Sequence, residues 1–263
     1  MKNWCVLLVF LFFSAFSFTQ SPYETNWKKE LPYIITGGAT LGAGAYLSTI
    51  PPLITPNELT TLDPNDVNRF DRIAIDLFSE NADRASDIFW LGSHLTPMLF
   101  LTGDETRENF GQIMTLYGEV AAINAGLTSI IKSATQRPRP FVFNPDVSEN
   151  LKFARNAKTS FLSGHTSMTA ANTFFVAKVF SDFYPESKWK AFIWGTAATI
   201  PAITGYLRVK AGKHYPSDVI AGYALGAAVG ILVPQWHKNK KLREKGISLN
   251  VGYNSARLTW NFK

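Results

Sequence analysis

Six long apolar stretches, each bounded by charge or by proline, constrain the fold of this chain more than any other feature. Each is long enough for a helix, and none alternates apolar and polar side chains as a half-buried strand does. The sequence therefore predicts an all-α bundle of about six apolar helices. A polar stretch at about 58–84 is predicted to form an amphipathic surface helix. The apolar stretches cover about residues 31–47, 88–103, 111–131, 164–183, 191–207 and 219–236.

The composition bears on whether these helices cross a membrane. A span needs about 20 predominantly apolar residues, and the charge-free windows 88–103, 191–207 and 219–236 are close to that limit. Charged residues make up only 17% of the chain, below the roughly 25% of ordinary soluble domains, which implies either extensive helix burial or contact with a membrane. The mean hydropathy of −0.01 favours the alternative, a soluble exported bundle. We expect a membrane-embedded bundle and keep the soluble one as the alternative.

The N-terminus has the pattern of a secretory signal. Lys2 precedes an apolar run at 4–13, and the small residues Ser14, Ala15 and Ser17 follow it. A short basic region, an apolar core and small residues before a cleavage point define such signals. We therefore expect residues 1–19 to be a signal peptide and the protein to be exported to the cell envelope; a retained anchor helix is the alternative. Cys5, the only cysteine, would leave with the signal, so no disulfide is expected.

The C-terminal residues differ in kind from the rest. A basic segment at 238–245 follows the sixth apolar stretch, and apolar side chains then alternate with polar ones at 247–253 and at 258–262. This alternation predicts a β-hairpin, with a turn at Asn254 and Ser255. A lone hairpin is marginal in water, so we expect it to pack on the bundle or on a neighbour.

Three clusters of charged residues and histidines lie at the ends of the apolar stretches. They occupy residues 132–140, 160–165 and 208–218, in that order along the chain. The net charge of +6 favours an anionic partner such as a phosphate or an acidic lipid. Nucleic acid is not expected as a partner, because no aromatic side chain is interleaved with the basic segment 238–245.

The cations of these clusters predict a phosphate pocket. Lys132, Arg139 and Arg208 lie at or just beyond the ends of apolar stretches, where long side chains reach a common point. Because Arg139 precedes a proline, we expect an extended turn that brings it back beside Lys132. Three cations suit a dianionic phosphate, whose oxygens the arginines bind as forks. Ser163 and Gly164 open the next apolar stretch, so backbone N–H groups at that helix start are expected to face the same anion.

Two histidines complete a reaction. His214 lies four residues before Asp218, and Pro216 suits the first turn of a helix. We expect Asp218 to hold one imidazole nitrogen and to leave the other free to attack phosphorus. His165, from a different helix, is expected to protonate the leaving oxygen and then to activate water. These parts fit phosphoryl transfer through a covalent histidine intermediate. No metal or other cofactor is expected, because the cations stabilise the developing charge.

The pattern K-x6-R-P, then S-G-H, then R-x5-H-x3-D resembles the signature of the type 2 phosphatidic acid phosphatase superfamily, which also includes the vanadium haloperoxidases. The resemblance covers about residues 85–236. Leu162 and Leu207 depart from it, because the pattern normally has proline and serine at these positions. The resemblance implies His214 as nucleophile, His165 as general acid, Asp218 as the orienting partner, and phosphate binding by Lys132, Arg139, Ser163, Gly164 and Arg208.

Residues and resemblance together predict a metal-independent phosphatase acting on a phosphate monoester or a lipid (pyro)phosphate, with its active site facing the periplasm. The alternatives are a soluble exported non-specific acid phosphatase, a vanadium haloperoxidase and a non-catalytic phosphate- or lipid-binding protein. The expected domain order is a signal peptide at 1–19, an N-terminal apolar helix and polar surface segment at 20–84, the catalytic bundle at 85–237, and the basic segment with the hairpin tail at 238–263.

Five further residues carry expectations of their own. His94 is expected to be a satisfied interior residue, and His237 a surface residue beside the basic segment. Glu119 lies inside an apolar stretch and is expected to pair with a cation from a neighbouring helix. Arg137 and Lys213 flank the cluster residues and are expected to attract anionic headgroups without touching the reacting phosphate.

Overall fold

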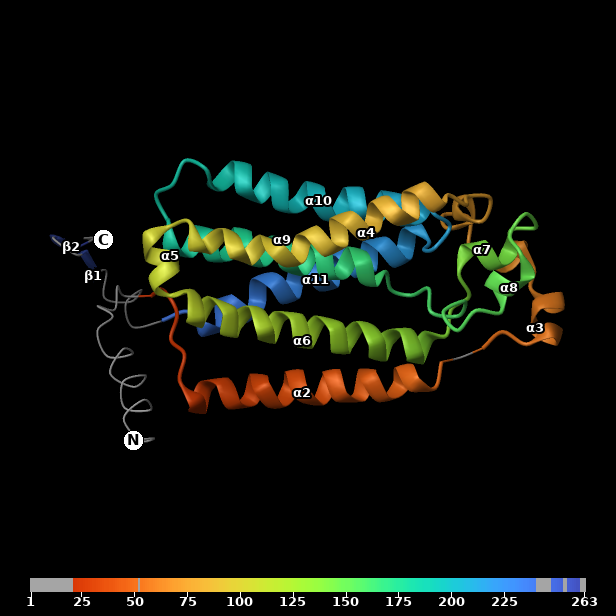
Figure 1. Cartoon of the computed structure of the whole chain (residues 1–263), viewed down its shortest axis with the longest axis horizontal. Coiled ribbons are helices and arrows are strands. Elements are labelled where there is room, and N and C mark those ends of the chain that lie inside the picture. The colour runs from red at the N-terminus through yellow and green to blue at the C-terminus, as the bar shows by residue number, and fades with distance from the viewer. Residues whose placement is uncertain (1–20, 52, 240–246, 253–254, 261–263) are drawn as a thin grey trace, which may run out of the picture.

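Five of the six apolar stretches become long helices of one elongated bundle (Figure 1). The stretch at 88–103 is divided between the second half of the remaining long helix, which begins at Glu80 and ends at Leu95, and a 3-10 turn at Thr96–Leu101. The computed structural model describes residues 21–51, 53–239, 247–252 and 255–260. Consecutive long helices alternate in direction, so α6 and α10 end where α9 and α11 begin (Figure 1). This alternation brings the three clusters to the same end of the bundle. The long helices are α2 (Trp27–Thr49), α4 (Glu80–Leu95), α6 (Phe110–Thr135), α9 (Gly164–Phe183), α10 (Lys190–Lys210) and α11 (Pro216–His237).

Short helices make the prediction of about six helices too low. The described residues also contain four short α-helices and three 3-10 turns. The predicted surface helix at 58–84 is wrong, because most of this segment is loop and short turns. Asp63 accepts a hydrogen bond from the Asn65 N–H, and Pro64 starts a new turn, so local side-chain bonding competes with a continuous helix. The short elements are α3 (Pro56–Thr61), η1 (Pro64–Asp66), η2 (Arg72–Ala74), η3 (Thr96–Leu101), α5 (Asp104–Glu108), α7 (Pro140–Phe143) and α8 (Glu149–Lys152).

Helix α9 lies at the centre of the bundle. It packs against α4, α6, α10 and α11, while α2 packs along α6. The main core lies between α6, α9 and α11, where Leu116, Val120, Phe175 and Val179 are fully buried. Burial of such side chains is the dominant favourable term in folding. The core therefore holds together the helices whose ends carry the clusters.

A stripe of three glycines lets α11 approach α9 closely. Gly222, Gly226 and Gly230 follow one another at intervals of four residues, so they lie on one face of α11. A Cβ atom on these glycines would lie 2.5, 1.9 and 2.5 Å from the backbone oxygens of Ser163, Ser167 and Ala171, respectively. Small residues at such spacing allow helix backbones to touch. The distance between α9 and α11 is thus set by main-chain contact.

The outer surface of the bundle carries many large apolar side chains. They lie on α2, α4, α10 and α11, and they form far more exposed apolar surface than scattered single residues do. Among the described residues, one helix, α11, is long and apolar enough to cross a membrane, as judged by length and composition alone. Examples of the exposed side chains are Ile34, Ile35, Ile88, Leu91, Leu95, Phe192, Tyr206, Ile220 and Trp236.

The two chain ends contain segments that the structure describes only in part. Strands β1 (Ile247–Gly252) and β2 (Ser255–Trp260) pair antiparallel, with Gly252 opposite Ser255, so Ser255 belongs to a strand and not to the predicted turn. The packing of this pair on the bundle stays a prediction. The predicted signal peptide lies outside the described residues, as does the basic segment after Asn239. Within that segment, Lys238 is paired with Asp182 at 2.6 Å.

Candidate active site

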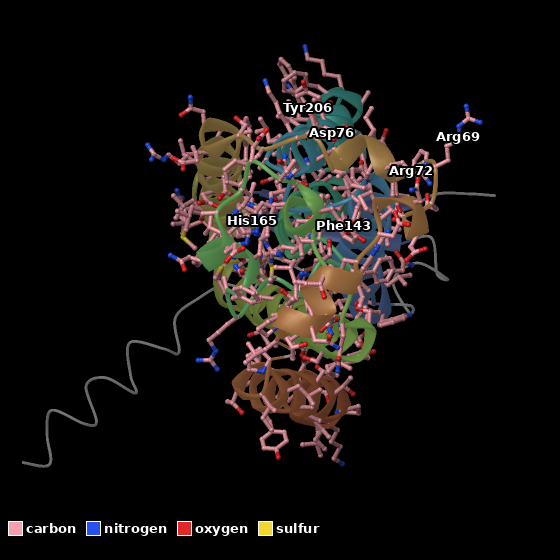
Figure 2. All side chains as sticks on the ribbon, turned by 90° about the vertical axis from the view of Figure 1, so that its right-hand side faces the viewer. Arg69, Arg72, Asp76, Phe143, His165 and Tyr206 are labelled. Carbon is pink, nitrogen blue, oxygen red and sulfur yellow. The ribbon has the colours of Figure 1, made fainter. Side chains whose placement is uncertain are left out.

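The three clusters meet at the end of the bundle where α6 and α10 end and where α9 and α11 begin. The segments that contain η2, α7 and α8 cover this end (Figure 1). Figure 2 looks onto it and shows His165 among the helices, whereas Arg69 and Arg72 lie toward the rim. The site is therefore an end-on pocket whose side chains come from four long helices and from the loops between them.

His214 is buried in the segment that joins α10 to α11, with 1% of its surface exposed. Gly212 makes the preceding turn with φ of +68°, and a Cβ atom there would lie 2.1 Å from the Leu77 carbonyl oxygen, so only glycine fits. The Nδ1–H of His214 donates to the Ser160 carbonyl at 2.7 Å. A carbonyl only accepts, so in the neutral ring Nε2 carries the free lone pair.

The surroundings of His214 keep its ring neutral. Burial is the largest cause that lowers the pKa of His214 well below 6.5, and the charges of Lys132, Arg139 and Arg208 lower it further. Low-dielectric surroundings and nearby like charges both disfavour a charged imidazole. At neutral pH His214 is therefore an unprotonated base with Nε2 available.

Asp218 does not hold the imidazole directly, contrary to the expectation from its spacing. Its Oδ2 lies 3.7 Å from His214 Nδ1, which is too long for a hydrogen bond. The same oxygen accepts from the Ser160 hydroxyl at 2.5 Å and from the Tyr215 N–H at 2.9 Å. Nδ1 already donates to the Ser160 carbonyl. Asp218 therefore acts on His214 through Ser160, whose hydroxyl it holds and whose carbonyl holds the ring.

Arg137 supports this arrangement from the other side by pairing with two carboxylates, while its attraction of headgroups stays a prediction. Its guanidinium donates to Asp218 at 2.6 Å and to Asp71 at 2.8 Å, and it lies 4.0 Å over the Tyr215 ring. Asp71 also accepts from the N–H and the hydroxyl of Ser217. Burial alone would raise the pKa of Asp71, but the hydrogen bonds from Arg137 and Ser217 outweigh it and hold that pKa below 3.8. Arg137 is thus a partly exposed bridge between two buried carboxylates.

The three predicted phosphate-binding cations gather around His214. Lys132 donates from Nζ to the Thr159 carbonyl at 2.6 Å, and Arg208 pairs with Asp83. The backbone at Arg139 is extended, with φ of −76° and ψ of 155°, as its position before a proline predicted. Burial, followed by the charge of Arg208, lowers the pKa of Arg139 to about 9.

Two of these cations have donors without a partner. Within the described part of the chain, the buried Nε atoms of Arg139 and Arg208 donate to no acceptor. Buried donors are nearly always satisfied, and an exception calls for a ligand, an ion or a water. Two neighbouring guanidinium groups that leave buried donors unused are suited to an incoming dianion.

Ser163 and Gly164 begin α9 as predicted, but only one of them offers its N–H. The Ser163 N–H donates to the Asp218 carbonyl at 3.0 Å, and its hydroxyl bonds the Thr166 hydroxyl at 2.9 Å. Gly164 is the first residue of α9, where backbone N–H groups lack intrahelical partners. A Cβ atom on Gly164 would lie 3.6 Å from Lys132 Cε, so this helix start faces the cations.

His165 is held by two residues of α4 that the sequence analysis did not single out. Its Nε2 bonds Asp87 at 2.8 Å, and the Trp90 ring lies 5.1 Å from the imidazole. Because a carboxylate only accepts, Nε2 carries a proton and Nδ1 is the nitrogen free to exchange one. Lys213 pairs with Asp83 at 3.2 Å, the same carboxylate that pairs with Arg208. The acidic residues at 71–87 were the available signal, but nothing in the sequence indicated their partners.

The remaining expectations concern residues away from this pocket. His94 is half-buried, and its Nδ1 donates to the Trp90 carbonyl at 2.8 Å, which agrees with a satisfied interior residue. His237 is 2% exposed, so the surface assignment is wrong. Glu119 faces Glu30 and His237 at the opposite end of the bundle and not a cation of the kind expected. Neither Glu119 nor His237 belongs to the candidate active site.

The similarity of this chain to known proteins lies in the region that contains the three clusters. The PAP2 superfamily model matches residues 114–242, which contain all three clusters. This part of the chain belongs to the PAP2 superfamily. The chain is 29% identical over 125 residues to a lipid A 4'-phosphatase of Porphyromonas gingivalis, a stretch that covers 46% of this chain and 49% of that one. It is 34% identical over 122 residues to phosphatidylglycerophosphatase B of Bacillus subtilis, covering 45% and 56%.

The chain spans about half the length of these two PAP2 relatives. Among solved structures, a transmembrane PAP2 type phosphatidylglycerolphosphate phosphatase from Bacillus subtilis aligns with a TM-score of 0.46 and 21% identity. That alignment covers 80% of this chain and 97% of the other.

Proposed function

We propose that this protein is a metal-independent phosphatase that hydrolyses a lipid phosphate or pyrophosphate through a phosphohistidine at His214. The observation that carries the proposal is a buried, neutral His214 whose Nδ1 is locked by the Ser160 carbonyl while three cations surround it. A nucleophile needs one free lone pair and a fixed orientation, and His214 has both. The names of the two PAP2 relatives support a phosphorylated lipid as the substrate class.

In the first step, Nε2 of His214 attacks phosphorus and the bond from phosphorus to the leaving oxygen breaks. Arg139, Arg208 and Lys132 bind the phosphoryl oxygens and stabilise the charge that develops on them. The unused Nε donors of the two arginines suit this role. Burial, followed by the charge of Arg208, lowers the pKa of His165 to about 4. A bound phosphate dianion offsets the charges of Arg208 and Arg139, so His165 takes up a second proton on Nδ1 and gives it to the leaving oxygen. The step yields the alcohol and a phosphorylated His214.

In the second step, His165 is neutral and retains the Nε2 proton that it shares with Asp87. Its Nδ1 takes a proton from water as that water attacks phosphorus, and the bond from phosphorus to His214 breaks. Inorganic phosphate leaves, His214 is again neutral, and His165 is again protonated. Asp87 acts here as a positioning residue, because it selects the nitrogen of His165 that exchanges the proton.

The location of the site supports a substrate held at a membrane surface. The exposed apolar side chains of α2, α4, α10 and α11 favour burial of the bundle wall in lipid. The pocket lies at the end of the bundle, where headgroups would be. A cavity of about 260 Å³ adjoins it, lined among others by Lys132, Arg155 and Asn156. Its polar lining suits a headgroup. The exported side is proposed for this end, on the basis of the signal-like N-terminus.

The purified full-length protein tests this proposal in a phosphate-release assay. The substrates are phosphatidate, phosphatidylglycerol phosphate, undecaprenyl pyrophosphate, a lipid A phosphate and a soluble ester. We expect His214→Ala to abolish release, and the parent enzyme to carry acid-labile, base-stable phosphate at His214. Glu186→Gln is the control, because Glu186 is exposed and lies in the loop between α9 and α10, at the other end of the bundle, and it should retain activity. Full turnover by the His214→Ala protein would exclude the covalent scheme.

Two further outcomes point to the alternatives. Oxidation of bromide by the vanadate-loaded protein with peroxide, without release of phosphate, would indicate a haloperoxidase. Binding of a phosphorylated lipid without any release of phosphate would indicate a non-catalytic binding protein. Vanadate should inhibit the phosphatase, because it occupies the same anion pocket.

A further inference from the structure

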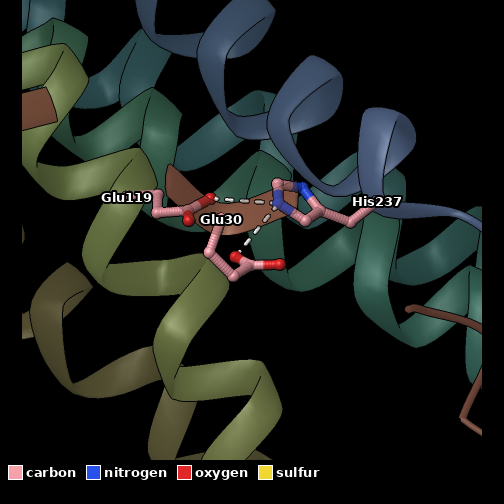
Figure 3. A group of neighbouring side chains, drawn as sticks. All are labelled: Glu30, Glu119 and His237. Atoms are coloured by element: carbon pink, nitrogen blue, oxygen red, sulfur yellow. Dashed lines mark ion pairs between the residues drawn. The ribbon is translucent and has the colours of Figure 1, made fainter. Parts of the chain in front are cut away.

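A second cluster of ionisable groups lies at the other end of the bundle from the catalytic pocket (Figure 3). Glu30 comes from the first turns of α2, Glu119 from α6 and His237 from the last turn of α11. The three residues are 6%, 6% and 2% exposed, respectively. The carboxylate oxygens of both glutamates and the Nε2 of His237 accept or donate no hydrogen bond within the part of the chain that the structure describes. Buried polar atoms without partners are rare and call for a ligand.

The tautomer of His237 determines whether a lone pair or an N–H group of the ring faces the carboxylates of Glu30 and Glu119. Its Nδ1 lies 2.8 Å from the Val233 carbonyl oxygen, which only accepts, so Nδ1 carries the proton. In the neutral ring the lone pair of Nε2 then points at Glu30 and Glu119 (Figure 3). Metal-binding histidines almost always donate their other ring N–H to a carbonyl or carboxylate in this way, because it fixes the ring. The local geometry of His237 is therefore that of a metal ligand.

The distances fit a metal better than they fit a hydrogen bond. Nε2 of His237 lies 3.3 Å from Oε2 of Glu30 and 3.3 Å from Oε2 of Glu119. An N–H···O hydrogen bond is normally about 2.7–3.2 Å long. Ligands bound tetrahedrally at about 2.0–2.2 Å from a zinc ion lie about 3.3–3.5 Å apart. One ligand atom from each residue lies within 4.8 Å of the other two.

The charges favour the same conclusion. Two buried carboxylates facing a neutral lone pair repel one another, and isolated buried charges are strongly unfavourable. A divalent cation neutralises both carboxylates and uses the Nε2 lone pair at once. One imidazole with two carboxylates is a donor set suited to a borderline ion such as Zn²⁺.

We propose that Glu30, Glu119 and His237 bind a first-row divalent metal ion, for which Zn²⁺ is the probe. The ion joins α2, α6 and α11, three helices that reach this point from separate parts of the sequence. Asp218 and His237 are 19 residues apart on α11, so roughly 28 Å separates this cluster from the catalytic pocket at 1.5 Å per residue. The metal is therefore structural and takes no part in phosphoryl transfer.

The first test is the metal content of the full-length protein, stripped with a chelator and then incubated with Zn²⁺. We expect about one equivalent per chain, and less than about a tenth of that in Glu119→Gln and in His237→Asn. The matched controls are His94→Asn and Glu186→Gln. His94 makes the same Nδ1 bond to the carbonyl four residues earlier, and Glu186 is an exposed glutamate at the same end of the bundle. Both controls should bind Zn²⁺ as the parent does.

The second test uses only the parent protein, in case a variant fails to fold. Adding Zn²⁺ to the stripped protein should raise its thermal midpoint, and adding Co²⁺ should produce the visible absorption of a tetrahedral site. Phosphatase turnover in a short assay should not change with Zn²⁺ or with chelator, so this test is independent of the proposed function. No change in midpoint and no Co²⁺ spectrum would overturn the proposal and indicate a proton shared by the two glutamates.

Discussion

Replacing Ser160 by alanine tests the relay from Asp218 to His214. The change removes the hydroxyl that donates to Asp218 at 2.5 Å, and it leaves the carbonyl that accepts from His214 at 2.7 Å. Both Ser160 and Asp218 are fully buried. A hydrogen bond to a charged group contributes about 1.5–3 kcal/mol. If this free energy is all lost from the transition state, kcat falls about 10- to 150-fold.

The assay measures kcat and KM for Ser160→Ala, for Asp218→Asn and for the double variant. We expect kcat to fall and KM to stay near the parent value, because Ser160 does not contact the phosphate-binding cations. The two changes interrupt one relay, so the double variant should lose less than the sum of the single losses. Ser181→Ala is the control. Its hydroxyl accepts from Trp194 at 2.8 Å at the other end of the bundle, so it should lower stability without lowering kcat.

A different pattern would refute the relay. Where a carboxylate bonds a catalytic histidine directly, as in a serine protease triad, an Asp→Asn change costs about 10⁴-fold in kcat. A loss of that size in Asp218→Asn, with full activity in Ser160→Ala, would mean that Asp218 contacts His214 directly during the reaction. The indirect geometry would then have no part in catalysis.

Three other predictions follow from the packing, the buried histidine and the location of the site. Gly226→Ala should lower the thermal midpoint by an amount equivalent to about 1–3 kcal/mol, because its Cβ would lie 1.9 Å from the Ser167 carbonyl oxygen. Gly195→Ala is the control and should leave the midpoint unchanged, because open space surrounds Gly195. Equal midpoints for the two variants would contradict the close contact. The folded pKa of His214 lies well below 6.5, so stability should be complete above pH 6.5 and fall as the pH drops below it. His214→Asn should lack that part of the pH dependence in thermal unfolding, and an unchanged pH profile would argue against a neutral buried ring. A cysteine at exposed Pro145, in a Cys5→Ser background, should react with a membrane-impermeant maleimide in cells with a permeabilised outer envelope; labelling only after lysis would indicate a cytoplasmic site.

Five of the six long helices were predictable, because charge or proline bounds their apolar stretches. Helix α4 (Glu80–Leu95) begins and ends eight residues earlier than the stretch predicted at 88–103. The predicted stretch at 164–183 has the same bounds as α9, since Ser163 precedes it and a charged loop follows it. The segment at 58–84 was not predictable in the same way. Its Asp and Arg residues suited an amphipathic helix, but the Asp63 side chain caps a new turn and helps to divide the segment. Local hydrogen bonds of this kind compete with the helix and leave little trace in the hydrophobic pattern.

Much of the candidate site was predictable, because its residues lie in three short motifs with fixed spacing. The parts that position them were not. The Ser160 carbonyl that holds His214 belongs to the main chain and carries no signal in the residue type. Asp71 and Asp87 reach the site from segments far from their partners, Arg137 and His165. The sequence specified which groups react, whereas the tertiary structure specifies how they are held.

The glycine stripe on α11 has a consequence for how the protein can change over evolution. His165 begins α9 and His214 just precedes α11, so the separation of acid and nucleophile depends on how these two helices meet. Main-chain contacts at Gly222, Gly226 and Gly230 set that separation. The apolar side chains elsewhere in the bundle can therefore drift to suit other lipid surroundings while the reacting nitrogens keep their places. Substitution of a glycine in the stripe would change the separation of α9 and α11, and changes in the other apolar side chains would not restore it.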